Sequence, residues 1–295
     1  MNTINFVVSA EILPIDVLHH FDQELEDLIS LSQTSKYFYH GIKNSKIKIK
    51  KLVMLRDNRS IKWFPFLDNV KILHTYNIKK YIHLFSRVHT LDLSQTNVVD
   101  VSSLGNVHTL DISRTNVVDV SALGKVHTLN LSHTEVEDVS ALGNVHTLKL
   151  TRTEVVDVSA LGKGTVYDLN LRATPVVDVS SLCNVHTLDL SYTNVSDVSA
   201  LGKGTVYDLN LSSSRVVDVS SLCNVHTLDL SFTEVEDVSS LGRVHTLNLT
   251  RTKVVDVSAL GNVHTLNINS TKVVDISALR KVHLLKGNSL SLMSS

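Results

Sequence analysis

The 295-residue sequence has few of the residues that cross-link, break or anchor a chain: two cysteines, three prolines and one tryptophan. The two cysteines, Cys183 and Cys223, allow no disulfide framework, which fits a reducing compartment. No apolar run approaches the roughly 18 residues of a membrane-spanning helix, and the first residues lack the basic flank of a signal peptide. We therefore expect an intracellular protein of the cytoplasm (the host's, if the source is viral), with the nucleus left open and no membrane partner.

An excess of charge is also missing, since 28 Lys and Arg residues oppose 29 Asp and Glu residues for a formal net charge of −1. The balance hides a division along the chain. Residues 1–87 carry 13 cations and 8 carboxylates, a net of +5, whereas residues 88–295 carry 15 and 21, a net of −6. A large body of net negative charge argues against a nucleic-acid partner, because cations must meet the phosphates.

Instead, the sequence contains one short motif that is repeated almost to the end of the chain. Val-His-Thr-Leu first occurs at Val88 and recurs at steps of 19 residues, apart from two steps of 21 residues where Gly-Lys-Gly-Thr lengthens the copy. Two copies read Val-Tyr-Asp-Leu, and the last, from Val282, is degraded. Ten complete copies at a short fixed period indicate a solenoid, in which each coil is stabilised by its neighbours.

The copy that begins at Val107 shows how one coil is built. Leu110 and Ile112 alternate with polar residues, which predicts a strand with one buried face. A polar corner follows, and the next aspartate precedes Val-Ser-Ala-Leu at the place where a side chain caps a short helical turn. Gly124 is expected to let the backbone turn back toward the next strand. The predicted structural caps are Asp119, Asp138 and Asp157.

This pattern, LxxLxLxxTxV followed by DVSAL, resembles the leucine-rich repeat. The resemblance implies a leucine-rich-repeat solenoid with one parallel strand per coil. The period is shorter than is usual for the family, so we expect short 3₁₀ or extended segments on the convex side in place of full helices. Threonine, as at Thr115, stands where the family usually has asparagine, and its hydroxyl is expected to bond between coils.

Three columns of near-identical side chains suggest chemistry but have simpler explanations. Stacked histidines such as His108 would converge in pairs at best, whereas zinc takes about four ligands, so a surface ladder is favoured over a metal site. The aspartates could hold calcium, but capping explains every member. Threonines such as Thr109 form an outward row, as in ice-binding solenoids, but two such rows do not lie side by side. No nucleophile–base pair or phosphate loop is present, so we expect no enzyme, no cofactor and no metal.

The varying positions are more informative than the constant ones. Two residues after the inner strand position, side chains change in charge and size from copy to copy, and they are expected to point outward at the strand's exit edge. Tyr192 and Phe232, flanked by arginines, look like interface anchors. Neutral drift on a solvated surface is the alternative interpretation. The predicted target-binding face consists of Arg114, His133, Arg152, Tyr192, Phe232 and Arg251.

The N-terminal segment breaks the repeat. Pro14 suits the first turn of a helix, and Val17, Leu18 and Phe21 fall on one helical face. The stretch from LPIDVLHHF to DLISLSQTSKYFY resembles an F-box, with a slightly shorter gap between its halves. The resemblance implies docking onto the small adaptor subunit of cullin–RING ubiquitin ligases; a plain helical cap on the solenoid is the alternative. The implied adaptor-binding residues are Leu13, Pro14, Ile15, Val17 and Leu18.

We therefore divide the chain into an F-box-like helical domain (1–45), degenerate repeats that cap the solenoid (46–87), the ten-copy solenoid (88–287) and a C-terminal tail (288–295). The combination resembles F-box/leucine-rich-repeat proteins with short repeats, of the kind encoded by large DNA viruses of amoebae. The resemblance implies a protein-interaction protein that recruits substrates to a cullin–RING ubiquitin ligase, with the F-box on the adaptor and the repeats on an unknown target protein. The alternative is a stand-alone repeat scaffold or binding module without a link to a ligase.

Overall fold

The computed structural model describes residues 49–55, 67–72 and 82–287. The F-box-like domain 1–45, with the predicted adaptor-binding residues from Leu13 to Leu18, lies outside the described residues, as does the tail 288–295. The domain boundaries taken from the sequence stay predictions.

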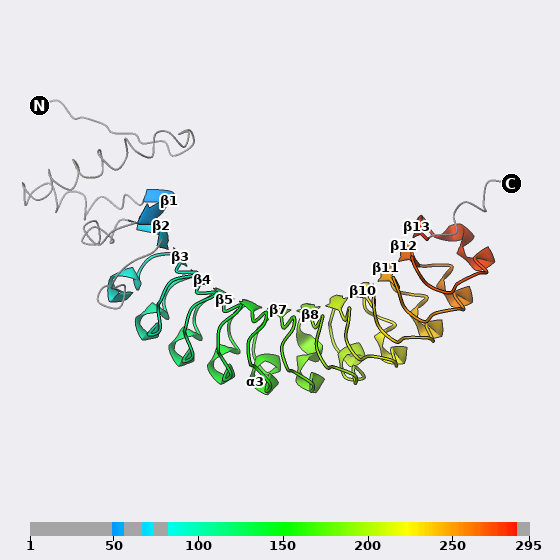
Figure 1. Cartoon of the computed structure of the whole chain (residues 1–295), viewed down its shortest axis with the longest axis horizontal. Coiled ribbons are helices and arrows are strands. Elements are labelled where there is room, and N and C mark those ends of the chain that lie inside the picture. The colour runs from blue at the N-terminus through cyan, green and yellow to red at the C-terminus, as the bar shows by residue number, and fades with distance from the viewer. Residues whose placement is uncertain (1–48, 56–66, 73–81, 288–295) are drawn as a thin grey trace, which may run out of the picture.

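The described strands form one thirteen-stranded parallel sheet in which the order of the strands is their order in the chain. Leu110 lies between Leu91 and Leu129 of the neighbouring coils, without a shift in register. The strands line the concave side of an arc that runs from β1 to β13 (Figure 1), which confirms the predicted parallel-strand solenoid. The strands are β1 (Ile49–Leu55), β2 (Leu67–Ile72), β3 (Thr90–Asp92), β4 (Thr109–Asp111), β5 (Thr128–Asn130), β6 (Thr147–Lys149), β7 (Asp168–Asn170), β8 (Thr187–Asp189), β9 (Asp208–Asn210), β10 (Thr227–Asp229), β11 (Thr246–Asn248), β12 (Thr265–Asn267) and β13 (Leu284–Lys286).

The convex side is made of short helical turns, as the period predicts. All are 3₁₀ turns except α3 (Ser159–Gly162), a single α-helical turn in a coil that Gly-Lys-Gly-Thr lengthens. None of the helices in the described ranges is long and apolar enough to cross a membrane. The 3₁₀ turns are η4 (Ile82–Phe85), η5 (Ser102–Leu104), η6 (Ser121–Leu123), η7 (Ser140–Leu142), η8 (Ser180–Asn184), η9 (Leu201–Lys203), η10 (Ser220–Leu222), η11 (Ser239–Leu241), η12 (Ser258–Leu260) and η13 (Ser277–Lys281).

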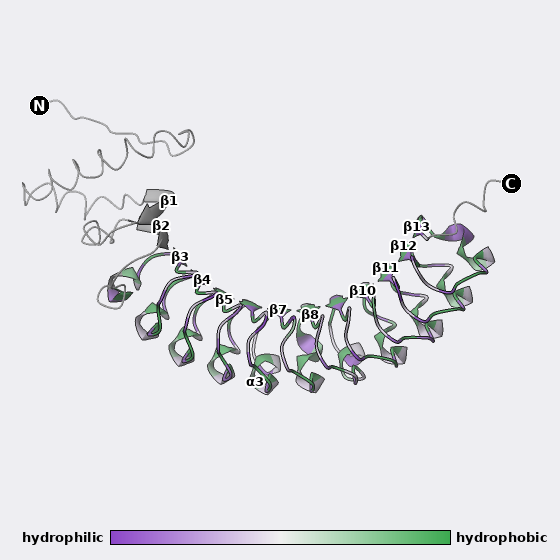
Figure 2. Cartoon of the chain, in the orientation of Figure 1, coloured by the Kyte–Doolittle hydropathy of each residue, from purple (hydrophilic) through white to green (hydrophobic). Residues whose placement is uncertain are grey.

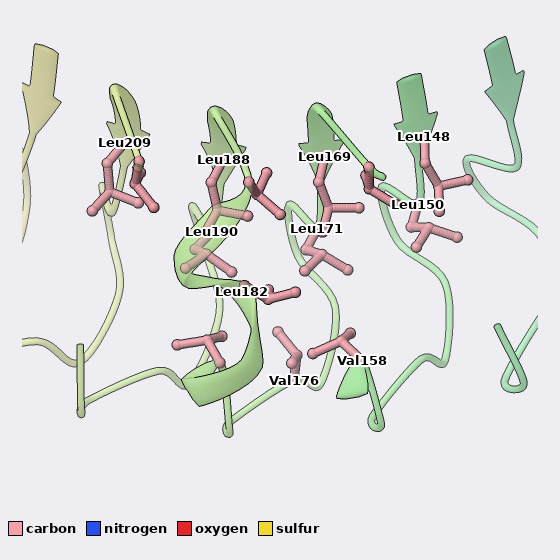
Figure 3. Close-up of a cluster of buried hydrophobic side chains, with 14 of the residues drawn as sticks. Leu148, Leu150, Val158, Leu169, Leu171, Val176, Leu182, Leu188, Leu190 and Leu209 are labelled. Atoms are coloured by element: carbon pink, nitrogen blue, oxygen red, sulfur yellow. The ribbon is translucent and has the colours of Figure 1, made fainter. Parts of the chain in front are cut away.

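Each coil directs six aliphatic side chains into a narrow interior. Figure 2 shows hydrophobic and hydrophilic segments alternating within the coils from β3 onward. Equivalent residues of successive coils stack in rows, such as Leu148, Leu169, Leu188 and Leu209 (Figure 3). Burying each such side chain stabilises the fold by about 1.5–3 kcal/mol. In the β4 coil the six are Val107, Leu110, Ile112, Val117, Val120 and Leu123, and none exposes more than 2% of its surface.

Backbone hydrogen bonds tie each coil to both of its neighbours. The amides of His108 and Thr109 donate to the carbonyl of His89 in the preceding coil. At the other end of the strand, the amide of Ile112 donates to the carbonyl of Asn130 in the following coil. The stability of any one coil therefore depends on the coils beside it.

The threonine column makes a different bond from the expected one. Thr115 exposes 5% of its surface, and its Oγ1 donates to the carbonyl oxygen of Ile112, in the same coil, at 2.6 Å. The expectation of a bond between coils is therefore wrong: the hydroxyl closes the corner after the strand and satisfies a buried carbonyl. Ser214, the only serine in this column, is buried, and its hydroxyl has no hydrogen-bond partner.

Gly124, at the return of the β4 coil, is required for space and not for backbone freedom. Gly124 has φ −62° and ψ −7°, and none of the described glycines has a positive φ. A Cβ atom added to Gly124 would overlap the carbonyl oxygen of Ala141 in the next coil. The expectation that Gly124 supplies a special backbone turn is therefore wrong, because this position excludes side-chain volume instead.

Candidate binding surface

The varying column after the strand has a left-handed backbone in all ten copies. Its φ angles lie between 54° and 61°, and within the described residues no other non-glycine residue has a positive φ. We call this column the exit rim, because it borders the concave face where each strand ends. The exit rim consists of Gln95, Arg114, His133, Arg152, Ala173, Tyr192, Ser213, Phe232, Arg251 and Ser270.

The left-handed conformation is unfavourable for these residues and is held in place by hydrogen bonds. A residue with a Cβ atom loses roughly 1–2 kcal/mol there, whereas glycine adopts it freely. The amide of Arg152 donates to the carbonyl of Arg172 in the next coil at 2.9 Å, and the amide of Thr153 donates to that of Leu150 at 3.2 Å. None of the ten residues is glycine or asparagine, so the chain keeps a strained side chain in every coil.

The six predicted target-binding residues all lie on the exit rim. Five are exposed, with Tyr192 at 54% and Phe232 at 52%, and His133 is half-buried. Arg114, His133 and Arg152 come from three successive coils, and Phe232 and Arg251 come from two. The rim therefore brings the predicted residues together in two groups along one edge.

The first group is a cationic cluster in the coils of β4, β5 and β6. The pKa of His133 is lowered, first by partial burial and then by the positive charges of Arg114 and Arg152. The histidine is therefore held toward its neutral form between two guanidinium groups. Guanidinium groups bind carboxylates and phosphates through paired hydrogen bonds, so this cluster suits an acidic group on a partner.

The second group pairs exposed aromatic rings with guanidinium groups. The Arg251 guanidinium lies 5.2 Å from the centroid of the Phe232 ring, and that of Arg172 lies 4.1 Å from the centroid of the Tyr192 ring. Both distances are within the range of a cation–π interaction. The Arg172 Nη1 also donates to the Ser191 Oγ at 3.0 Å.

Arg172 is a candidate binding residue that the sequence interpretation missed. It stands one residue before the exit rim, in a column where the other copies have Ser, Thr or Asn. The presence of one large cation in a column of small polar residues could have identified Arg172 from the sequence.

A row of acidic and amide side chains crosses the concave face beside the exit rim. The Asp111 Oδ1 accepts a hydrogen bond from the amide of Ser113 at 2.9 Å, and its Oδ2 accepts one from the Asn130 Nδ2 at 2.9 Å. The same link joins the Asp229 Oδ2 to the Asn248 Nδ2 at 3.0 Å. These side chains are partly buried and bonded to each other, so they brace the turn that carries the rim.

The predicted capping aspartates lie farther along each coil, just before the helical turn. The Asp119 Oδ1 accepts a hydrogen bond from the amide of Ser121 at 2.9 Å, and the equivalent bonds of Asp138 and Asp157 measure 2.8 Å. Hydrogen bonds from Ser121, through its hydroxyl and its amide, hold the pKa of Asp119 below its usual range. The N-cap position of this turn is Val120, so Asp119 lies one residue before it. Its bond to the amide two residues later forms an Asx turn.

The histidine column is a continuous stack of rings along the edge where the strands begin. From His89 to His283, adjacent ring centroids lie between 4.3 and 5.1 Å apart, and Tyr167 and Tyr207 take places in the same stack. The pKa of His108 is lowered, first by burial and then by its histidine neighbours in the stack. Across residues 49–55, 67–72 and 82–287, no group of three His, Cys, Asp or Glu side chains is arranged to hold a metal ion.

Comparison with solved structures places this architecture among known folds. An internalin (InlF) from Listeria monocytogenes matches with a TM-score of 0.62 at 24% identity, over 70% of this chain and 68% of that one. A leucine-rich-repeat protein of Leptospira interrogans matches with a TM-score of 0.64 at 15% identity, over 81% of this chain and 72% of that one. The fold is that of a leucine-rich-repeat solenoid.

A third match is the plant peptide hormone receptor RGFR1 in complex with RGF2. Its TM-score is 0.58 at 15% identity, over 82% of this chain and 50% of that one. Identities at this level show a shared fold and nothing finer. No protein-family model and no curated protein matches the chain.

Proposed function

We propose that this chain is a protein-interaction module that holds a target protein on the exit rim. The supporting observation is that all ten rim positions keep a side chain in a backbone conformation that favours glycine. Selection for stability alone would favour glycine at these turns, so the side chains have another use. The scaffold beneath them is rigid and repetitive, which suits precise placement of contacts.

The residue types on the rim indicate the chemistry of the target. Arg114 and Arg152 suit carboxylates, and the exposed rings of Tyr192 and Phe232 suit an apolar or aromatic side chain. Arginine and aromatic residues dominate the energy of most protein interfaces. We infer a target surface with acidic groups at one end and an apolar anchor about three to five coils away.

The experiment is affinity capture with the full chain and two matched variants. Tyr192→Ser/Phe232→Ser removes the rim's exposed rings, whereas Ala122→Ser/Ala141→Ser changes two exposed apolar side chains on the convex turns to a residue that other coils already have there. We expect the rim variant to lose the partner that the wild-type chain captures, and the second variant to keep it. Retention of that partner by both variants would contradict the proposal.

We further propose that the target is delivered to a cullin–RING ubiquitin ligase in the cytoplasm or nucleus. The support is the resemblance of residues 13–21, LPIDVLHHF, to the start of an F-box. In this role the chain catalyses nothing itself and holds the target near the ubiquitin-charged enzyme. The adaptor-binding residues would be Leu13, Pro14, Ile15, Val17 and Leu18.

A pull-down with the small adaptor subunit tests the ligase role separately. We expect the wild-type chain and the rim variant Tyr192→Ser/Phe232→Ser to bind the adaptor, and Leu13→Asp/Pro14→Ala to lose it. If the wild-type chain does not bind, the ligase role is wrong and the alternative of a stand-alone binding scaffold replaces it.

A further inference from the structure

Each coil has two flanks, which differ sharply in charge. The chain leaves the strand at the exit rim, follows one flank to the helical turn, and returns along the other flank to the next strand. In the β4 coil, Asn116, Val118 and Asp119 point outward from the first flank, and His108 and Lys125 point outward from the second. The strand spans the concave face, so its two ends place these flanks on opposite sides of the arc.

The first flank is acidic in seven of the ten coils from β3 to β12 and net neutral in those of β9, β11 and β12. Its three outward columns hold fifteen exposed carboxylates and three exposed cations, a net charge of −12. The cations are Arg215, Lys253 and Lys272, and Lys253 is paired with Glu234. The carboxylates are Asp100, Asp119, Glu135, Glu137, Asp138, Glu154, Asp157, Asp178, Asp197, Asp218, Glu234, Glu236, Asp237, Asp256 and Asp275.

The second flank is basic. Between residues 87 and 287 it carries no carboxylate in the return turns, which lead to the Val of the next coil, or in the column of stacked His and Tyr rings. Its seven exposed cations give a net charge of +7, and apart from Arg280 they recur every 38 to 40 residues, which is every second coil. At about 4.8 Å per coil, the cations form a row spaced by about 10 Å. They are Arg87, Lys125, Lys163, Lys203, Arg243, Arg280 and Lys281.

In most coils the charges of the two flanks cannot neutralise each other within one chain, because the apolar interior separates them. The exceptions lie at the lengthened coils, where Lys163 and Lys203 come close enough to Asp157 and Asp197 to help lower the pKa of those carboxyls. Elsewhere the acidic columns follow the end of the strand and the basic columns precede its start, so the opposite charges lie on opposite flanks of each coil. A molecule charged in this way is complementary to a second copy of itself.

We propose that copies of this chain stack flank to flank, with the acidic flank of one against the basic flank of the next. A simple translation along the shortest dimension of the arc brings the two flanks together and keeps the curvature of both copies matched. Both flanks have the same spacing, since each is built on the same coil repeat. Opposite charges can therefore meet at about every second coil without a change of register.

The acidic flank also provides shape and apolar surface for this contact. Exposed valines, between 42% and 60% exposed from Val99 to Val255, form a broken row along it, and the basic flank opposes them with the stacked rings. The acidic surface is hollowed between the coils of β5 and β6, where Glu137, Glu154 and Asp157 line a depression. In the stack this depression lies opposite Lys125 or Lys163 of the neighbouring copy.

Such a contact joins different surfaces of the two copies, so it does not close into a dimer and can continue. The exit rims of successive copies would then lie parallel, at the same end of each coil. Several copies bound to one large target would gain avidity without any new contact. This inference does not depend on the proposed target or on the ligase role.

The test is sedimentation of the full chain at pH about 7.5 in low and high salt. Screening shortens the reach of charges from about 10 Å at 0.1 M salt to about 3 Å at 1 M salt. We expect the weight-average mass to rise with concentration, without a limit at the dimer, in about 0.05 M salt, and to fall to the monomer in about 1 M salt. A monomer in low salt, or a limit at the dimer, would overturn the proposal.

Two variants with the same change in net charge locate the contact. Lys125→Glu/Lys203→Glu/Arg243→Glu/Lys281→Glu changes the basic flank from +7 to −1. The matched control reverses four cations on the concave face and exit rim: Arg114→Glu/Lys149→Glu/Arg152→Glu/Arg251→Glu. We expect the flank variant to remain monomeric in low salt and the control to associate. Equal behaviour of the two variants, both of which alter only exposed side chains, would overturn the flank-to-flank arrangement.

Discussion

In the β4 coil the chain turns twice, at Arg114 where it leaves the strand and at Gly124 where it returns. At Arg114 the backbone is left-handed, with φ 56°, although the residue is a large cation. At Gly124 the backbone is an ordinary right-handed one, with φ −62°, although the residue is glycine. Intrinsic backbone preference alone would favour the opposite choice at each turn.

The contrast shows what each turn is selected for. At the return, the next coil lies so close that any Cβ atom would meet a backbone carbonyl, so packing between coils decides the residue. At the exit, the side chain points away from the stack and the coil accepts the strain that it brings. Gly124 at the return turn therefore serves packing between coils, whereas the exit turn leaves its side chain free for the recognition that we propose.

The largest effect is expected at the return turn, from Gly124→Ala. The new methyl group would overlap the carbonyl oxygen of Ala141, and the two coils would have to move apart. Overpacking of this kind destabilises proteins by about 1–3 kcal/mol. Urea denaturation of the variant measures the loss. Lys125→Ala, at the exposed neighbouring residue, is the control and should change the free energy of unfolding by less than about 0.5 kcal/mol. Equal stability of the two variants would contradict the packing account.

The ring stack beside the return turn should make the solenoid sensitive to mild acid. Burial, followed by neighbouring charges, lowers the pKa of His108 and His264 below the ordinary value of 6.5. The unfolded chain therefore binds more protons as the pH falls through that value, and the free energy of unfolding decreases. Thermal melts at low protein concentration should show a lower midpoint at pH about 5 than at pH about 7.5.

A ring that does not titrate in this range provides the control for the pH effect. His108→Tyr/His264→Tyr uses the residue that already occupies the stack at Tyr167 and Tyr207. This variant should lose less stability between the two pH values than the wild-type chain. The capping aspartates do not interfere, because their lowered pKa values place their titration below the usual 3.8. Identical melts at both pH values for the wild-type chain would rule out the effect.

A smaller effect is expected at the exit turn, from Ser214→Thr. The serine hydroxyl is buried without a partner, whereas Thr193 and Thr233 in the neighbouring coils each donate to the carbonyl three residues before them. Restoring that bond to Leu211 should stabilise the chain by about 0.5–1.5 kcal/mol. The reverse change, Thr233→Ser, is the matched control and should destabilise it. If neither variant changes the free energy of unfolding, the threonine hydrogen bonds add little to the stability of the corner.

The periodic positions were predictable from the sequence because one physical requirement acts on all of them. The alternation of Leu110 and Ile112 with polar residues predicts a strand with one buried face, and the short period leaves room only for 3₁₀ turns, as η6 shows. The count of copies and the parallel order follow from the repeat itself. Each of these features depends on where side chains go, which periodicity encodes.

The conformations of the two turns were not predictable in this way. Left-handed residues are usually recognised by Gly, Asn or Asp, and the exit rim has none of these. The role of Gly124 depends on the distance to the next coil, which one coil's sequence does not contain. The pairing of Arg172 with Tyr192 joins two coils through a column that is otherwise small and polar. The candidate site was thus located by its variation, while its geometry required the structure.

The most direct test of this account is the free energy of unfolding of Arg114→Gly/His133→Gly/Arg152→Gly, measured by urea denaturation. Glycine relieves the left-handed strain in three successive coils, and of the lost side chains Arg114 and Arg152 are exposed and His133 is half-buried. We predict a variant at least as stable as the wild-type chain, with a gain of up to about 1 kcal/mol per site after the added chain entropy of glycine is deducted from the relieved strain. A loss of several kcal/mol would show that the rim side chains support the fold, and the assignment of the exit rim to recognition would be contradicted.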